Sequence, residues 1–194
     1  MKSAVVAKVL AKRAKEVVQH KPFCYGQTVD ICRFLPTRNE RKFIMAFSTG
    51  LESGVMDIQY YLTLWRTTNS LKRVDCRSMR CVLGTEIDLR NILWIYRLKK
   101  YYQVFGDAIY GFLIPVNHRL SVDILAKMIA CKDVAELQSV LSNTIYSTVF
   151  GNFDNPEQHL VQAVQRRYMT EGRYSHIALI CGYLFTHTTK TQTS

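Results

Sequence analysis

The sequence predicts an all-α protein, and three observations support this fold class. Only 4 Pro and 9 Gly are spread over 194 residues, whereas β-sandwiches and barrels need a turn about every 8–12 residues. Apolar residues recur at helical spacing along most of the chain. Helix start and stop signals stand at the ends of several of these segments. The composition, with 48% hydrophobic and 21% charged residues, is typical of a folded globular chain.

The hydrophobic pattern divides the chain into three parts. These are an N-terminal helical segment (1–53), a helical domain (54–185) and a tail (186–194). The tail has no periodicity, and we expect it to be disordered. Its sequence, THTTKTQTS, offers no apolar face to pack against a neighbour.

The N-terminal segment contains two predicted helices with an irregular connection between them. Residues 2–19 form a basic helix with one apolar stripe, a pattern found in first helices of bundles and also in calmodulin targets and membrane-surface helices. Packing against the rest of the domain is the interpretation that we favour. Residues 22–37 hold two prolines and follow no pattern, and residues 39–47 form a short second helix that ends near Gly50.

Two helices are predicted before the centre of the chain. Residues 55–71 carry an uninterrupted apolar pattern, with Asp57 in the first turn, where a carboxylate suits the helix dipole. Residues 75–83 form a second helix with Asp75 as its cap. Gly84 follows directly, and glycine is the usual residue after a helix C-terminus, so we expect this helix to stop there.

Residues 85–105 form the predicted central helix. Thr85 is a possible cap, acidic residues stand in the first turn and basic residues in the last turns, so these charges all complement the helix dipole. Two nearly opposite apolar arcs predict neighbours on both sides. The first arc is Ile87, Trp94, Ile95, Leu98, Tyr101 and Phe105, and the second is Leu89, Ile92, Leu93 and Tyr96. Asn91 falls inside the first arc, so its amide should bond to another helix or a turn.

Four further helices complete the helical domain after a looser stretch around Gly106–Pro115. The first covers 122–131, and a capping box in Asp133-Val-Ala-Glu136 starts the second, through Leu141. Asn155-Pro156 is a cap followed by proline at the first helical position, and it starts the third helix, which runs to about Thr170. The last helix covers 174–185.

The charge and cysteine content narrow the function classes. The formal charge of +11 favours an anionic partner, although it is equally consistent with a solvated basic surface. The 6 Cys show no zinc-type spacing, and we expect them to be reduced and to pack as small hydrophobes. Lysines interrupt the apolar N-terminus and no run is long enough to cross a bilayer, so we expect a soluble, cytoplasmic protein.

The sequence carries none of the catalytic motifs that we sought. It lacks the phosphate-binding P-loop, the dinucleotide fingerprint, the zinc-protease motif and the hydrolase nucleophile elbow. We therefore expect no catalysis, no cofactor, no metal and no small-molecule substrate. Basic residues alternate with aromatic ones around 97–102 and 165–168, which leaves a nucleic-acid-binding helical module as the alternative function.

Residues 84–102, GTEIDLRNILWIYRLKKYY, closely resemble a signature of the C/d subunit family of vacuolar-type rotary ATPases. The helix around residues 57–65 and the segments after Arg119 are similar to the flanks of that signature. The residues that carry the resemblance as a structural signature are Glu86, Asp88, Asn91, Trp94 and Tyr96.

The resemblance implies helical bundle lobes that form part of a funnel-like subunit. Such a subunit sits on the membrane proteolipid ring, at the cytoplasmic face, and receives the central rotor shaft. It couples ATP-driven proton or sodium transport without catalysing a reaction and meets the membrane only through the ring. Family members are considerably longer than 194 residues, so we interpret the chain as a truncated or rearranged member.

Four basic residues of the signature are candidates for contact with the shaft. Arg90 and Arg97 lie one heptad apart on one polar edge, and Lys99 and Lys100 follow them. A positive surface would suit an acidic shaft end, because charge complementarity sets the register of an interface. The alternative is that these are ordinary solvated charges at a helix C-terminus.

Overall fold

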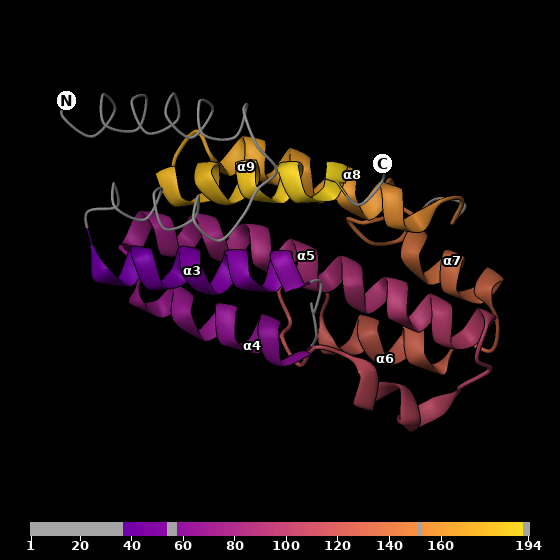
Figure 1. Cartoon of the computed structure of the whole chain (residues 1–194). Coiled ribbons are helices and arrows are strands. Elements are labelled where there is room, and N and C mark those ends of the chain that lie inside the picture. The colour runs from indigo at the N-terminus through magenta and orange to yellow at the C-terminus, as the bar shows by residue number, and fades with distance from the viewer. Residues whose placement is uncertain (1–36, 54–57, 151–152, 192–194) are drawn as a thin grey trace. The chain divides into compact units, whose positions relative to one another are not determined.

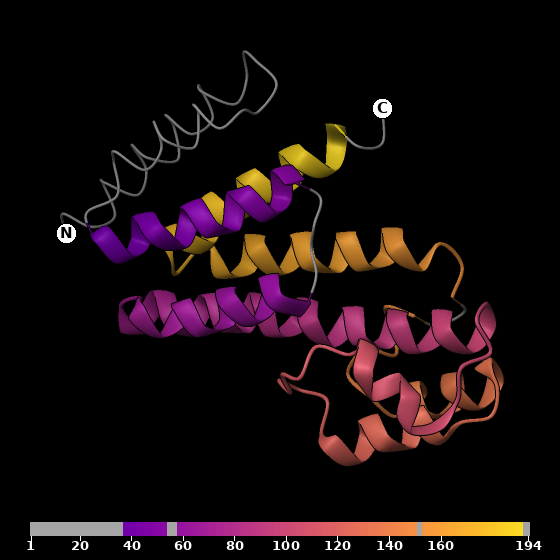
Figure 2. The same ribbon diagram turned by 60° about the horizontal axis from the view of Figure 1, so that its bottom comes forward.

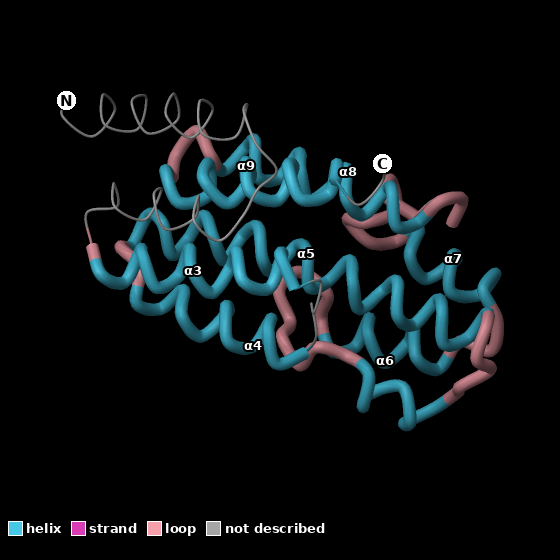
Figure 3. The backbone as a smooth tube through the Cα atoms, in the orientation of Figure 1, coloured by secondary structure: helices cyan, strands magenta, loops and turns pink. Residues whose placement is uncertain are grey.

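The computed structural model describes residues 37–53, 58–150 and 153–191, and every regular element in these ranges is a helix (Figure 1). In chain order the elements are α3 (Arg38–Ser53), α4 (Ile58–Thr67), η1 (Thr68–Ser70), α5 (Arg73–Lys100), η2 (Gly106–Phe112), α6 (Val122–Ala130), α7 (Val134–Ser142), α8 (Pro156–Glu171) and α9 (His176–Thr191). Figure 3 shows these helices joined by loops, with no strand in the described ranges. The all-α prediction is confirmed, while the predicted helix at 2–19 and its irregular continuation lie outside the described residues.

The chain forms two compact units. Unit 1 comprises the described residues up to Val82 together with those from Gln165 onward, and unit 2 comprises Leu83–Val164. Helices α5 and α8 each contribute residues to both units.

In unit 1, helix α3 packs between α4 and α9, and α3 and α9 lie side by side in both views (Figures 1 and 2). Aromatic rings join three of its helices, since the Tyr168 ring lies 6.2 Å from that of Phe47 and 5.5 Å from that of Phe185. The close approach of α8 and α9 needs Gly182, where a Cβ would lie 2.9 Å from Cβ of Tyr168. The buried core of this unit includes Phe43, Ile44, Phe47, Tyr61, Leu64, Met79, Tyr168, Ile177, Leu184 and Phe185.

In unit 2, the second part of α5 contacts the end of α6 through Lys99 and the start of α8 through Arg97. Helix α6 contacts both α7 and η2, and Figure 2 shows this group in orange and pink tones. Its buried core includes Ile87, Leu89, Ile92, Ile95, Leu98, Ile109, Met128, Leu137, Leu141, Tyr146, Phe150 and Leu160. Most of these are Leu and Ile side chains at helical spacing, as the pattern of the sequence predicts.

The central helix differs from the prediction at both ends. Gly84 does not stop a helix, because α5 runs without a break from Arg73 to Lys100. A Cβ at Gly84 would lie 2.3 Å from Cγ of His118, so this glycine serves a close approach inside the helix. The helix ends at Lys100 rather than Phe105, and Gln103 takes a left-handed conformation with φ 52° just after it.

The two apolar arcs of α5 are only partly buried. All four residues of the second arc are buried, and so are Ile87, Ile95 and Leu98 of the first. Tyr101 and Phe105 are exposed because they follow the helix end and no longer share its face. Trp94 is 38% exposed, so the helix does not bury its whole first arc.

The later helices match their start signals closely. Ser121 caps α6, Asp133 caps α7 and α8 begins at Pro156, as predicted. Helix α3 continues past Gly50 to Ser53, and α9 continues to Thr191. Residues 186–191, which the sequence suggests to be without regular structure, are therefore helical.

Candidate functional site

The acidic residue at the centre of the signature is a buried hub of hydrogen bonds in unit 2. Asp88 Oδ2 accepts hydrogen bonds from the backbone N–H of Arg119 at 2.8 Å and of Leu120 at 3.2 Å, and from the Tyr146 hydroxyl at 2.8 Å. Asp88 Oδ1 accepts a longer bond, 3.4 Å, from the N–H of His118. A carboxylate that receives several backbone N–H bonds compensates much of its desolvation. Asp88 therefore anchors the loop before α6 to α5.

The Tyr146 hydroxyl completes this hub. Burial, followed by the nearby charge of Asp88, raises the pKa of Tyr146 above its ordinary value of 10.0. The hydroxyl therefore keeps its proton and acts as a donor to Asp88. Through this bond α5 also holds the segment that follows α7.

Asn91 meets the prediction that its amide bonds to another segment. Its Nδ2 donates to the carbonyl of Ile114 at 3.0 Å, and its Oδ1 accepts from the N–H of Ile114 at 2.9 Å. The Asn91 amide thus pairs with both the backbone N–H and the backbone carbonyl of Ile114, so neither buried group is left without a hydrogen bond. Asn91 and Asp88 together fix the loop between η2 and α6.

All four candidate shaft contacts have a partner inside unit 2. Arg90 pairs with the buried Glu86 one turn earlier, with Nη2 and Oε1 2.9 Å apart. Lys99 is only 5% exposed, and its ammonium donates to the carbonyls of Ile129, at 2.8 Å, and Cys131, at 2.5 Å. These carbonyls lie at the C-terminus of α6, where a cation is favourable.

The prediction that Lys99 belongs to the contact surface is therefore corrected. Its side chain points into unit 2 and binds the end of α6, so it does not present a surface charge. Burial lowers the pKa of Lys99 from its ordinary value of 10.5. The sequence suggested a surface residue because basic side chains are common in the last turn of any helix.

Arg97 and Lys100 remain at the surface, close to exposed aromatic rings. The guanidinium of Arg97 lies 5.8 Å from the centre of the Trp94 ring and pairs with Glu157 at the start of α8. Lys100 Nζ donates to the Tyr96 hydroxyl at 2.6 Å and lies 5.4 Å from the centre of the exposed Tyr101 ring. We refer to Trp94, Arg97, Lys100 and Tyr101 as the basic–aromatic surface.

A pocket of about 550 Å³ adjoins this surface within unit 2. Its lining consists of the end of α5 and the start of α8, namely Tyr96, Lys100, Tyr101, Phe153, Asp154, Asn155, Pro156 and Glu157. The Phe153 ring stacks on that of Tyr96 with centroids 4.2 Å apart. One ammonium, of Lys100, and two carboxylates, of Asp154 and Glu157, line the pocket, so its charge does not select an anion.

Three residues that contact the signature helix, one at Asp88 and two beside the pocket, were absent from the sequence-based set. Tyr146, Phe153 and Glu157 lie far from the signature in the chain, and only Glu157 carried a signal, as an acidic residue in the first turn of a predicted helix. Partial burial opposes ionisation of Glu157, but the hydrogen bond from Arg97, a backbone hydrogen bond and the charge of Arg97 together outweigh it, so the pKa of Glu157 is lowered.

The regular elements of the described residues are all helices, and the signature residues Asp88 and Asn91 bind loops of their own unit. The family model described as ATP synthase (C/AC39) subunit matches residues 53–188. The chain therefore belongs to the C/AC39 subunit family of V-type ATP synthases. No curated protein and no solved structure shows a significant match.

Within the described ranges, no helix combines the length and the apolar character that crossing a bilayer requires.

Proposed function

We propose that this chain acts as a non-catalytic coupling subunit of a V-type ATPase. In this role it links the central-stalk rotor to the membrane proteolipid ring during ATP-driven proton or sodium transport. It lies on the cytoplasmic face and meets the membrane only through the ring. The observation that carries the proposal is the family match over residues 53–188.

The internal hydrogen bonds of the signature support this role. The polar groups of Asp88, Asn91 and Lys99 bind loops and helix ends of unit 2. A subunit that transmits force needs such internal ties, because a loosely packed lobe would deform under load. The residues that hold the fold are therefore distinct from Arg97 and Lys100, which lie at the surface although each has a partner in the same unit.

The basic–aromatic surface is the proposed contact with the shaft. Arg97 and Lys100 supply positive charge, and Trp94 and Tyr101 supply exposed apolar area beside it. Aromatic and arginine side chains are enriched at protein interfaces. A net charge of +11 also favours encounter with an acidic partner.

Affinity capture tests the assignment. The tagged chain is expressed in cells that contain the ATPase, and the retained proteins are identified from cytoplasm and from detergent-solubilised membranes. The proposal predicts recovery of central-stalk and proteolipid-ring subunits that persists in moderate salt. Recovery of nucleic acid alone, lost as salt is raised, would contradict it and favour a basic nucleic-acid-binding module.

A further inference from the structure

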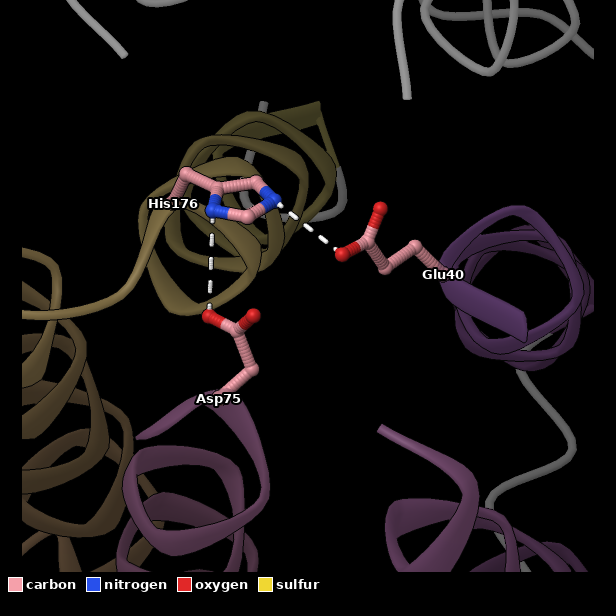
Figure 4. A group of neighbouring side chains, drawn as sticks. All are labelled: Glu40, Asp75 and His176. Carbon is pink, nitrogen blue, oxygen red and sulfur yellow. Dashed lines mark ion pairs between the residues drawn. The ribbon is translucent and has the colours of Figure 1, made fainter. Parts of the chain in front are cut away.

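A cluster of three ionisable side chains lies inside unit 1, away from the basic–aromatic surface. Figure 4 shows the imidazole of His176 between the carboxylates of Glu40 and Asp75, which come from α9, α3 and α5. His176 Nε2 lies 3.7 Å from Glu40 Oε1, and His176 Nδ1 lies 3.8 Å from Asp75 Oδ1. Glu40 is 0% exposed and Asp75 is 3% exposed.

Local structure brings these residues together and orients them. Glu40 lies in the first turn of α3, where its N–H donates to Thr37 Oγ1 and its Oε2 accepts from the Thr37 N–H. Ser175 precedes α9, and its hydroxyl accepts from the Ala178 N–H while it donates to Asp75 Oδ1 at 2.7 Å. Both carboxylates are thus held in place by helix starts, each with one oxygen already engaged.

Two buried atoms that point at one another have no hydrogen bond. These are Glu40 Oε1 and His176 Nε2. The Lys72 ammonium lies 3.4 Å from Glu40 Oε1, but the Lys72 side chain is 58% exposed and this ion pair supplies no hydrogen bond. A buried polar atom that lacks a hydrogen bond is costly, by about 1–3 kcal/mol, so a ligand that meets this oxygen would be favoured.

We propose that Glu40, Asp75 and His176 bind a divalent transition-metal ion, with Zn²⁺ as the representative of its class. The three potential ligand atoms lie within 4.8 Å of one another. Two ligands that are each about 2.0–2.1 Å from one ion lie at most about 4.2 Å apart. The 3.7 Å between His176 Nε2 and Glu40 Oε1 satisfies this limit, and small side-chain movements bring Asp75 into range of the same ion.

The donor set determines the class of ion. An imidazole nitrogen suits Zn²⁺ and its neighbours in the first transition row, whereas Ca²⁺ and Mg²⁺ prefer oxygen ligands throughout. Two carboxylates and a neutral imidazole carry a charge of −2, which a dication balances. One ring nitrogen binds the ion, and the other keeps its proton toward a carboxylate, as metal-binding histidines commonly do.

Metal binding would join three helices that are distant in the chain. Because the ion would bind the folded unit and not the unfolded chain, it would raise the stability of unit 1. The positive ends of three helices surround the cluster, so we expect weaker binding than at a thiolate zinc site. This inference does not depend on the proposed coupling function.

Calorimetry with the full chain tests the site. The protein is stripped with a chelator, dialysed and titrated with ZnCl₂ and then with CoCl₂ under reducing conditions. We expect one equivalent of ion, a rise in the melting temperature, and a Co²⁺ spectrum without the charge-transfer band of thiolate ligands. That band would show cysteine ligation instead, which the 6 Cys of the chain could supply.

Variants assign the ligands. Glu40→Gln, Asp75→Asn and His176→Gln should each weaken binding at least about tenfold, while Glu157→Gln and His159→Gln should leave it unchanged. X-ray absorption on the unmodified protein gives an answer that does not depend on variant folding, and imidazole and carboxylate ligands are expected there. The absence of Zn²⁺ binding, sulfur ligation, or unchanged binding by the His176→Gln protein would overturn the proposal.

Discussion

A Cβ placed on Gly84 would lie 2.3 Å from Cγ of His118 and 2.7 Å from its Cβ. Atoms this close to the backbone of His118 cannot move aside by a rotamer change alone. The loop before α6 therefore packs directly on the backbone of α5, at the point where unit 2 begins.

Gly84→Ala should destabilise the protein although alanine is the better helix former. The helix gains about 1 kcal/mol from alanine, but steric overlap in a packed interior costs about 1–3 kcal/mol. We expect a net loss in the free energy of unfolding, measured by urea denaturation. Adding His118→Ala to this variant should recover part of the loss.

Gly111→Ala is the matched control in the same unit. Gly111 is exposed and nothing lies within 4 Å of a Cβ built there, so its stability should change by less than about 0.5 kcal/mol. A Gly84→Ala protein as stable as the unmodified chain would refute the close-packing explanation.

Asp88→Asn should be among the most destabilising conservative changes in unit 2. An amide keeps one acceptor but turns an NH₂ group toward backbone N–H donors, and bonds to a charged acceptor contribute about 1.5–3 kcal/mol each. We expect a loss of about 3 kcal/mol by chemical denaturation. Asp107→Asn, at an exposed position of η2, should have little effect.

A double-mutant cycle isolates the bond between Asp88 and Tyr146. Tyr146→Phe alone should cost about 1 kcal/mol. In the Asp88→Asn background its cost should be smaller, because the two groups share one hydrogen bond. Strictly additive losses would show that the hydroxyl contributes nothing through Asp88.

Lys99→Met keeps the aliphatic stem and removes the ammonium, leaving the carbonyls of Ile129 and Cys131 without their donor. A loss of about 1–3 kcal/mol is expected. Lys127→Met, at an exposed position of α6, is the control. Equal stability of both variants would mean that Lys99 does not cap α6.

The contribution of Lys99 to the free energy of unfolding should depend on pH in the alkaline range. Burial lowers the pKa of Lys99 below 10.5, so the unfolded chain binds this proton more tightly than the folded chain. The contribution of Lys99 to stability should therefore rise as the pH increases from the lowered pKa toward 10.5, and stay constant below that range. The measurement is the stability difference between the unmodified chain and Lys99→Met as a function of pH.

The Arg97–Glu157 pair should contribute little to stability and only when Glu157 is ionised. An exposed pair is worth about 0.2–1 kcal/mol, so Glu157→Gln should cost no more than that at neutral pH. The pKa of Glu157 is lowered from 4.5, and the contribution is therefore present above 4.5 and lost as the pH falls through the lowered value. A cost that persists in acid would contradict the ion pair.

The sequence predicted features that depend on neighbours in the chain. The capping pattern at Asp133 and the Asn155-Pro156 pair placed the starts of α7 and α8. The position of Asn91 on an apolar face predicted a partner outside its own helix, and Ile114 is that partner. Each of these inferences rests on local chemistry or helical periodicity alone.

Features that depend on distant segments were not predictable in the same way. A glycine after an apolar run looks the same whether it ends a helix or admits a close neighbour, and only the loop at His118 decides for Gly84. Lys99 resembled a surface residue because its acceptors lie 30 and 32 positions further along the chain. Glu40, Asp75 and His176 likewise show no common spacing in the sequence.

The proposed contact with the rotor shaft is the basic–aromatic surface. The double charge reversal Arg97→Glu with Lys100→Glu should reduce the capture of central-stalk subunits from solubilised membranes at least about tenfold. The matched control, Lys127→Glu with Lys132→Glu, changes two exposed lysines of unit 2 by the same total charge. It should capture the central-stalk subunits as well as the unmodified chain does. Circular dichroism confirms that both proteins remain folded. Undiminished capture by the Arg97→Glu and Lys100→Glu protein would contradict the account.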